Sequence, residues 1–335
     1  MNVLADRHHH ALYYSLQRLF EDRLGMSLYT PIGHEWWDEH YWRFGAGYGD
    51  DRLAQQFLSM DGWHLTPFGV YESRDGHHPE RDILGVTLEQ ARKMPWAFAV
   101  ASVQDNQRGF SAFARDTGAQ YVLHAGNTNQ QIDWGLQPLV ISTNESQLVG
   151  QAVRVHQEID RRTFKYRPPY GTKVIRSFVN CFASTPCHAV YEKVRALLPE
   201  YAFAVHGIDG EQGNVGTVRE IAELMAGSAW GWHDKHQGDG FGHVIHDWAA
   251  IGRPIIGHAS HYRGLMAERF WQDGVTCIDL DRHDPSEVAG IIERTTPEQH
   301  LAMCKAIRAE FDKIDWDLEA ASVADLLGVR QAVAA

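Results

Sequence analysis

Two aspartates, Asp239 and Asp247, lie eight positions apart around the tripeptide Gly240-Phe241-Gly242. The apolar residues that follow recur at helical spacing and end at Gly252, so the sequence predicts a tight turn that leads into a helix. Asp239 would then lie in the loop and Asp247 about two turns into the helix. The N-terminus of a helix offers unpaired backbone N–H groups to an anion, and a carboxylate accepts hydrogen bonds from hydroxyl groups. A ligand with both phosphate and hydroxyl groups, such as a nucleotide sugar, fits this pattern.

This element resembles the Glu-x7-Glu motif of retaining glycosyltransferases with the GT-B fold, and especially glycosyltransferase family 4, although both acids are Asp in this chain. Further motifs flank it in the order of that family: a strand and glycine loop at 201–210 (YAFAVHGIDG), a strand and donor-phosphate loop at 255–264 (IIGHASHYRG), an Asp-Gly turn and strand at 272–281 (QDGVTCIDLD), and a helix at 284–294. The resemblance implies an enzyme that transfers a hexosyl or pentosyl group from a nucleotide diphosphate sugar, such as a UDP sugar, with retention and without a metal ion or other cofactor.

The resemblance also implies roles for particular residues. Asp239 would act in catalysis at the donor sugar, and Asp247 would accept hydrogen bonds from the ribose. The remaining residues expected to bind the donor are Gly207, Asp209, Lys235, Gly240, Phe241, Gly242, Ser260 and Arg263. The family has an Arg and a Lys for the diphosphate after the first strand of its second domain, whereas this chain has Asn180-Cys181-Phe182 there. Lys235 and Arg263, or Lys173 and Arg176, are the expected replacements.

A second set of polar residues follows predicted strands in the first half of the chain. Asp6, His8 and His9 follow a strand at 2–5, and Asp105 follows one at 97–103. Ligands bind at the carboxyl ends of parallel strands, and imidazole can relay a proton near neutral pH. We therefore assign Asp6, His8 and Asp105 to catalysis, and His9 to acceptor binding. A role at the start of a helix is the alternative for the histidines, and an N-cap role is the alternative for Asp105. Asn127, after a strand at 120–124, is a further residue expected to bind the acceptor.

The elements that must position these residues alternate between strands and helices. Further apolar strands are predicted at 27–32 and 139–143, and helices at 10–24 and 107–117, which indicates parallel sheets with helices on both faces. The aromatic stretch 36–64 is expected to form an insertion or lid, and Pro168-Pro169 a linker. A second unit would begin with a strand at 174–182 and a helix at 187–198. We predict an α/β protein of the GT-B class, with two Rossmann-like domains facing across a cleft. These are an acceptor-side domain at 1–168, a nucleotide-sugar donor domain at 169–316, and a C-terminal helix at 317–335 that packs back on the first domain.

The composition of the chain argues against some classes of partner. The chain has 335 residues, a formal net charge of −12 and four cysteines without a Cys-x-x-Cys pair. No run is long and apolar enough to span a membrane, and the N-terminus lacks signal-peptide zones, so we expect a cytoplasmic protein without a membrane partner. The acidic total argues against binding nucleic acid by charge alone.

A local basic segment nevertheless allows the hypothesis that DNA is the acceptor. It includes Arg161, Arg162, Lys165 and Arg167. Residues 6–25 also resemble, more weakly, phage-encoded glycosyltransferases that modify 5-hydroxymethylpyrimidines in DNA. In this hypothesis of DNA modification, Arg161 and Arg162 bind the acceptor, and the aromatic residues Trp36, Trp37, Tyr41 and Trp42 stack on or beside an extruded base.

Other hypotheses stay open beside it. The acceptor can instead be a glycan, a lipid-linked sugar or a small molecule. A metal-dependent hydrolase would use His233, His236, Asp239, His243, His246 and Asp247 as ligands. An inactive module that only binds a sugar nucleotide or a nucleic acid would explain why both motif acids are Asp and why the Arg/Lys pair is missing.

Overall fold

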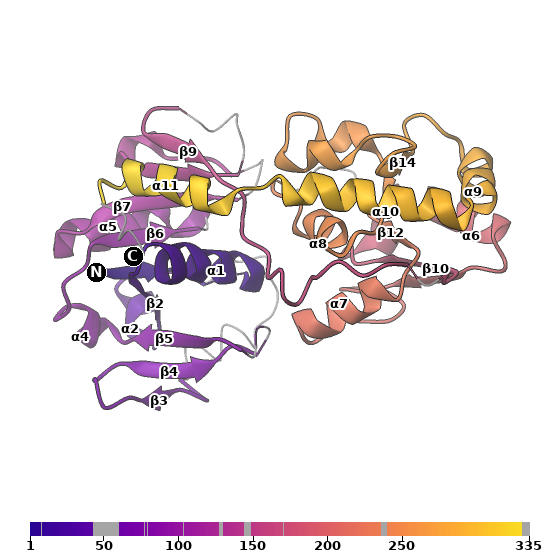
Figure 1. The fold of residues 1–335 in the computed structure, drawn as a ribbon. Helices are drawn as coiled ribbons and strands as arrows, with labels where there is room; N and C mark the ends of the chain where they lie inside the picture. The colour runs from indigo at the N-terminus through magenta and orange to yellow at the C-terminus, as the bar shows by residue number, and fades with distance from the viewer. Residues whose placement is uncertain are drawn as a thin grey trace. The chain divides into compact units, whose positions relative to one another are not determined.

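The computed structural model describes residues 1–7, 9–42, 60–76, 78, 80–102, 104–126, 130–143, 149–169, 171–235 and 240–329. The chain falls into two compact units (Figure 1). One comprises Met1–Glu158 with Trp316–Ala335, and the other comprises Ile159–Asp315. Each unit is built around its own largely parallel sheet, which confirms the predicted α/β class. No helix in the described part of the chain is long and apolar enough to cross a membrane.

Within the described residues, the first unit has a nine-stranded sheet of order β3-β4-β5-β2-β1-β6-β7-β8-β9. Its strands are β1 Asn2–Ala5, β2 Ser27–Pro31, β3 His64–Leu65, β4 Tyr71–Arg74, β5 Asp82–Val86, β6 Phe98–Ala101, β7 Gln120–Ala125, β8 Leu139–Ser142 and β9 Ala152–Arg154. Neighbouring strands are parallel except that β4 runs antiparallel to both β3 and β5. The predicted strands of this unit are present, but the antiparallel edge was not predicted.

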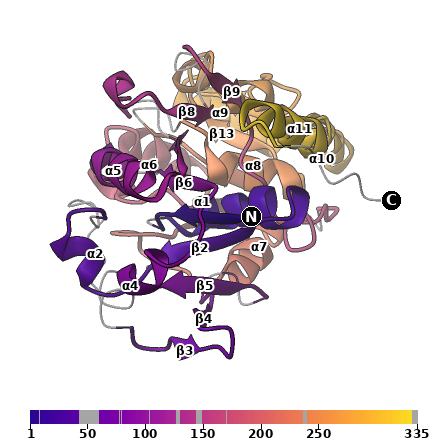
Figure 2. The same ribbon diagram turned by 90° about the vertical axis from the view of Figure 1, so that its left-hand side faces the viewer.

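Helices cover both faces of this sheet. They are α1 His10–Gln17, which continues as a π-helical segment Arg18–Arg23, α2 Glu35–Asp38, α4 Leu88–Ala91, α5 Gln107–Thr117 and α11 Trp316–Leu326. Figure 2 shows α5 on one side of the sheet and α1 and α11 on the other. The connections from β1 to β2 through α1 and from β6 to β7 through α5 run in opposite directions along the sheet. Because such crossovers are right-handed as a rule, α1 and α5 are expected on opposite faces.

The prediction that aromatic residues stack on an extruded base is wrong for Trp36 and Trp42. Trp36 and Trp42 have exposed fractions of 0% and 1%, and both belong to the hydrophobic core of the first unit. Trp36 contacts the ring of Phe113 on α5, with ring centroids 5.1 Å apart. Only Trp37 of the three tryptophans is exposed. Burial of these large rings stabilises the unit and removes them from any contact with an extruded base.

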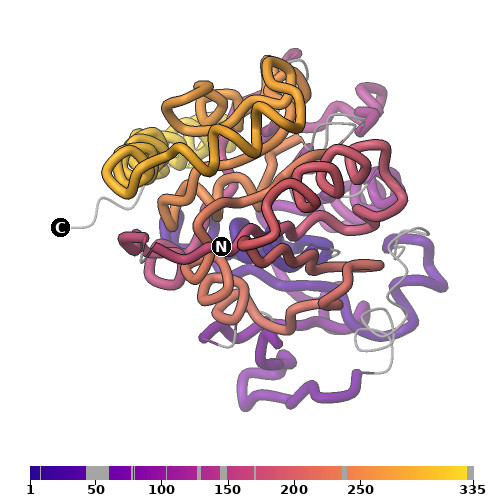
Figure 3. The backbone as a smooth tube through the Cα atoms, turned by 90° about the vertical axis from the view of Figure 1, so that its right-hand side faces the viewer, coloured from indigo at the N-terminus to yellow at the C-terminus, as the bar shows by residue number. Residues whose placement is uncertain are grey.

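The second unit has a fully parallel sheet of order β11-β10-β12-β13-β14. Its strands are β10 Val174–Ser177, β11 Ala202–Val205, β12 Trp230–Trp232, β13 Ile255–Gly257 and β14 Cys277–Asp279. Its helices are α6 His188–Leu197, α7 Val218–Ala226, α8 His243–Ile251, α9 Pro285–Arg294 and α10 Pro297–Asp312 (Figure 3). Helix α6 contacts α9, whereas α8 contacts α7 and α10.

Two details of this unit differ from prediction. Strand β10 ends at Ser177 rather than at Phe182, and the chain then reaches a 3-10 turn at Phe182–Ser184 through Cys181, whose φ is +55°. Helix α8 ends at Gly252 as predicted, where φ is +79°. Asp247 is the fifth of its nine residues, so it lies just over one turn into the helix and not two.

Each sheet has a point where the strand order reverses. The chain crosses from β10 to β11 on one side and then returns to β12 on the other side, and β2 and β6 flank β1 in the same way. In open α/β sheets, ligands bind at the carboxyl ends of the strands beside such a reversal. The loops after β10 and β12, and those after β1 and β6, are therefore the places to look for a site.

Candidate active site

Most residues predicted to bind the donor lie on one edge of the second sheet. Gly207 and Asp209 follow β11, Lys235 follows β12, and Ser260 and Arg263 follow β13. The Gly240-Phe241-Gly242 turn leads directly into α8. Because all five strands are parallel, their carboxyl ends bring these loops to a common edge. Asp239 lies outside the described residues, which resume at Gly240.

The Gly-Phe-Gly turn is built to hold the start of α8. Gly242 is the N-cap residue at φ +76°, a conformation that favours glycine. Phe241 is buried and stacks on the imidazole of His246 at 3.9 Å between ring centroids. His246 Nδ1 lies 3.0 Å from the carbonyl oxygen of Gly242. No side chain caps this N-terminus among the described residues. The positive end of the α8 dipole at this turn favours an anionic ligand.

Asp247 is the second carboxylate of the motif. Its side chain is partly buried, and burial raises the pKa of its carboxyl group well above the usual range. No described residue forms a hydrogen bond or an ion pair with it. A carboxylate withdrawn from water without a partner costs free energy of folding, so such groups are candidates for functional sites.

The loop after β13 is held by two carboxylates. Ala259 donates its backbone N–H to Asp279 Oδ1 over 3.1 Å. Ser260 donates its N–H and its hydroxyl to Asp281, over 2.6 and 2.9 Å. These carboxylates belong to Asp279-Leu280-Asp281, an Asp-x-Asp sequence at the end of β14, and no role was predicted for them. The N–H and the hydroxyl group of Ser260 both already donate hydrogen bonds to Asp281. To donate to the nucleotide sugar, as predicted, Ser260 would have to give up one of these bonds.

Arg263 is exposed and lines a pocket of about 540 Å³ in this region. The other charged residues of the pocket are Glu268, Asp273, Asp279, Asp281 and Arg282. Carboxylates therefore outnumber guanidinium groups, and the pocket by itself favours a cation over a diphosphate. Arg263 stays a predicted phosphate ligand.

The loops after β10 and β11 are locked together at the position where the family has its cations. Asn180 Oδ1 accepts a hydrogen bond from Ile208 N over 3.1 Å, and Cys181 N donates to Ile208 O over 2.7 Å. Gly207 lies beside Asn180 at φ +112°, and Asp209 is exposed at φ +60°. Asn180 therefore ties two loops and supplies no positive charge.

A cluster that the sequence analysis missed lies on the same edge. Asp234, directly after β12 and His233, has an exposed fraction of 0%. Its Oδ1 lies 2.7 Å from His258 Nδ1 and 3.8 Å from His261 Nδ1. The hydrogen bond with Asp234 raises the pKa of His258. Burial, together with the charge of Asp234, raises the pKa of the Cys187 thiol to about 12. Position at strand ends is the sequence signal that points to Asp234 and His258.

The ligands assigned to a metal-dependent hydrolase do not gather in the described part of the chain. His246 stacks on Phe241, as described above, and His233 is fully buried. The candidate metal group found among the described residues consists instead of Cys187, Asp234 and His258. His236 and Asp239 lie outside the described residues.

At the corresponding edge of the first sheet, Asp6 joins two strands. Its exposed fraction is 1%, its Oδ1 accepts from Ser102 N over 2.8 Å, and its Oδ2 accepts from Asn106 Nδ2 over 2.8 Å. Asn106 is the N-cap residue of α5, but its side chain does not cap the helix. Asp105 is exposed on the 3-10 turn Gln104–Asn106. Asp6 thus fixes the loop that carries Asp105.

The histidines after β1 are only partly described. His9 is exposed, and its carbonyl accepts from Tyr13 N over 3.0 Å at the start of α1. His8 and Asn127 lie outside the described residues. Beside them, and not predicted, Arg7 forms a buried ion pair with Asp75 at 3.0 Å.

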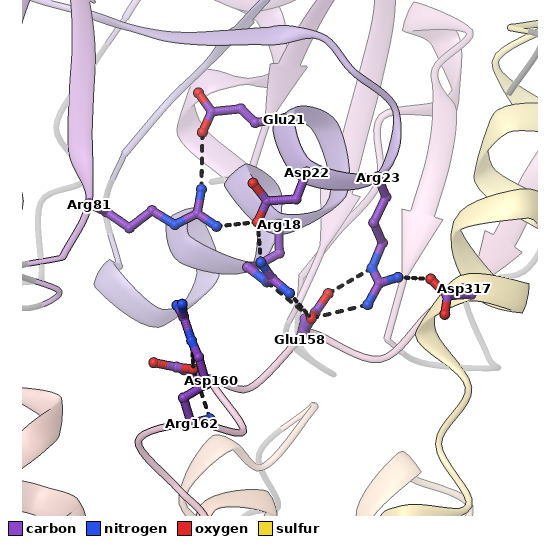
Figure 4. A network of polar contacts seen from close by, with 9 residues as sticks. All are labelled: Arg18, Glu21, Asp22, Arg23, Arg81, Glu158, Asp160, Arg162 and Asp317. Carbon is purple, nitrogen blue, oxygen red and sulfur yellow. Dashed lines mark hydrogen bonds and ion pairs between the residues drawn. The ribbon is translucent and has the colours of Figure 1, made fainter. Parts of the chain in front are cut away.

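The basic segment predicted to bind the acceptor makes contacts within its own unit. Arg161 donates to Ile314 O over 3.1 Å and lies over the ring of Phe311. Arg167 pairs with Glu223 at 2.6 Å. Arg162 pairs with Asp160 at 3.3 Å but keeps 73% of its side chain exposed (Figure 4). Two of these three arginines are thus already used in structural contacts.

Comparison with known proteins identifies the fold. No family model matches the chain, and no curated protein matches it. Solved structures match it over almost its whole length. Anabaena HepE, in complex with UDP and glucose, has a TM-score of 0.65 at 12% identity and covers 98% of this chain and 99% of its own. A glycosyltransferase from Rickettsia africae has a TM-score of 0.63 at 10% identity, with 97% of each chain covered. Sucrose-phosphate synthase from Thermosynechococcus elongatus has a TM-score of 0.62 at 12% identity, covering 97% and 98%. The predicted GT-B fold is confirmed.

Proposed function

We propose that this protein is a glycosyltransferase that moves a hexose from a nucleotide diphosphate sugar to a hydroxyl group. The observation that carries the proposal is Asp247, a partly buried carboxyl group on α8 with no hydrogen-bond or ion-pair partner among the described residues. The N-terminus of α8 follows the Gly-Phe-Gly turn. Similar HepE structures hold UDP with glucose, or UDP-glucose. A uridine diphosphate sugar is therefore the first donor to test.

In this proposal Asp247 accepts hydrogen bonds from the ribose hydroxyls, and the N–H groups at the start of α8 face the diphosphate. Asp239 would act at the donor sugar. Lys235 and Arg263 would supply the positive charge that Asn180 does not. The carboxyl edge of the first sheet would receive the acceptor, with Asp6 as a positioning residue for the loop of Asp105. Retention of configuration belongs to the proposal through the resemblance alone. No metal ion takes part in the transfer, so added magnesium or manganese leaves the rate unchanged.

For the acceptor we propose a saccharide or a small hydroxyl compound ahead of DNA. Trp36 and Trp42 are in the core, and Arg161 and Arg167 are engaged in their own unit. These observations remove much of the basis for hydroxymethylpyrimidine DNA, which stays in the test as one acceptor among several.

The test is an acceptor and donor screen read by mass spectrometry. It compares the parent protein with Asp247→Asn and with Glu293→Gln, an exposed carboxyl group on α9 of the same unit. Loss of a hydrogen bond to a charged group costs about 1.5 to 3 kcal/mol, so Asp247→Asn should lower kcat/KM by about 10- to 100-fold. Glu293→Gln should match the parent. Equal rates for all three proteins would refute the role of Asp247. Donor binding without transfer to any acceptor would favour the inactive module.

A further inference from the structure

The cluster of Cys187, Asp234 and His258 contains the three ligand types that zinc accepts in proteins, a thiolate, a carboxylate and an imidazole. One possible ligand atom from each residue lies within 4.8 Å of the others. Ligand atoms around a tetrahedral zinc ion lie about 3.5 Å apart, so a shift of roughly 1 Å closes the site. The residues come from three separate elements, since Cys187 precedes α6, Asp234 follows β12 and His258 follows β13.

Asp234 supplies a second and independent observation. It is fully buried, and its Oδ1 is engaged by His258. Its other oxygen, Oδ2, is also buried, and no described group donates a hydrogen bond to it. A buried carboxylate oxygen without a partner is costly, and a cation is the group that satisfies it best.

We propose that Cys187, Asp234 and His258, with His261 as the fourth ligand, bind a divalent metal ion of the zinc class. His261 is adjacent, with its Nδ1 3.8 Å from Asp234 Oδ1 and its ring stacked on that of His258. It lies outside the group of three mutually close ligand atoms, so its side chain must move to complete the site. Four protein ligands make a closed site of the structural type, in which the ion does not contact a substrate. Bound metal would join the loop after β13 to β12 and α6. The inference is independent of the proposed transferase activity.

The alternative is a metal-free cluster in which the thiol and the imidazole both donate to Asp234. The metal-bound and the metal-free cluster differ in the state of Cys187. Its sulfur is a thiolate in the first, because a metal displaces the proton of its sulfur ligand, and a thiol in the second. Cobalt distinguishes them, since a cobalt–thiolate bond gives a charge-transfer band in the near ultraviolet.

The experiment uses the full-length protein without an affinity tag, stripped of metal and titrated with cobalt and with zinc. We expect one ion per chain, a charge-transfer band, and displacement of cobalt by zinc. Cys187→Ser should abolish the band. Cys181→Ser, an exposed cysteine six positions away, should keep it. His258→Gln should weaken zinc binding by at least about 100-fold, since loss of groups that only orient ligands already costs about 10- to 100-fold.

Circular dichroism of each variant checks that it is folded. A parent protein that binds neither ion stoichiometrically would overturn the proposal. A band that survives in folded Cys187→Ser would overturn it as well. Because the readout is metal binding, failure here is distinct from failure of the glycosyltransferase proposal, which is measured by transfer.

Discussion

At the scale of the residue, Asp247 holds a carboxyl group in a partly buried position, where an ionised carboxylate lowers the stability of the folded protein. Burial raises its pKa in the folded protein above the value of about 3.9 that a free aspartate has. At a pH below about 3.9 the carboxyl group is protonated in both the folded and the unfolded state, so its ionisation does not affect stability. As the pH rises through the folded pKa, ionisation favours the unfolded state, so stability is lost.

Replacing this carboxyl by an amide should therefore stabilise the protein at high pH. Asp247→Asn should raise Tm relative to the parent at pH 8, whereas at pH 4 the two should differ little. Calorimetry across this range measures the difference, with Glu293→Gln as the exposed control. A difference between parent and Asp247→Asn that is the same at both pH values would mean that Asp247 is not held in a desolvated site.

At the scale of the element, the loops at the carboxyl edge of the second sheet hold one another. The loop after β11 turns at Gly207, where φ is +112° and an added Cβ atom would lie 2.4 Å from Asn180 Oδ1. Gly213, in the same connection, also has a positive φ, +68°, but a Cβ atom there would meet nothing within 4 Å. Alanine substitutions at Gly207 and Gly213 therefore distinguish the cost of a steric contact from the cost of backbone strain.

Gly207→Ala should destabilise the protein more than Gly213→Ala does. The alanine at position 213 meets only the left-handed backbone cost of about 1 to 2 kcal/mol. At position 207 the contact with Asn180 is added, and the total should exceed that cost by about 1 kcal/mol or more. Urea unfolding of the two variants measures the difference. Equal losses would show that Asn180 moves aside freely and that the two loops are not locked.

Much of the element order was predictable because apolar runs and helix punctuation are local signals. Helix α5 lies at the predicted residues, and Asp284 forms the capping box of α9. The antiparallel edge was missed because β3 has only two residues, both exposed, so no apolar pattern marks it. The parallel order of the strands was enough to place the donor loops on one edge.

The site was predictable only where the residues lie within one motif. Cys187, Asp234 and His258 are far apart in sequence, and they meet only because β12 and β13 are neighbours and α6 begins beside them. Burial of Trp36 was also beyond a local pattern, because the ring that it contacts, Phe113, lies on another element, α5.

At the scale of the whole molecule, the first unit is discontinuous in sequence. Val323 and Ala324 of helix α11, with Leu327 directly after it, belong to the core of this unit. The same C-terminal segment supplies Glu319, which accepts a hydrogen bond from His156 N over 2.7 Å. Asp317 pairs with Arg23, and the same arginine also holds Glu158 at 2.8 Å (Figure 4). The second unit, by contrast, is one continuous segment.

This asymmetry predicts how fragments behave. Burial of a Val or Leu side chain contributes about 1.5 to 3 kcal/mol, and a domain is stable by only about 5 to 15 kcal/mol. A fragment of residues 1–158 loses two such side chains together with its polar contacts to α11, so it should unfold at low urea without a sharp transition. Joining residues 316–329 to it through a flexible linker should restore cooperative unfolding. A fragment of residues 159–315 should unfold cooperatively by itself and should be unaffected by the same addition. If fragment 1–158 unfolds as sharply alone as with the linked helix, α11 is an accessory to the first unit and not a part of its core.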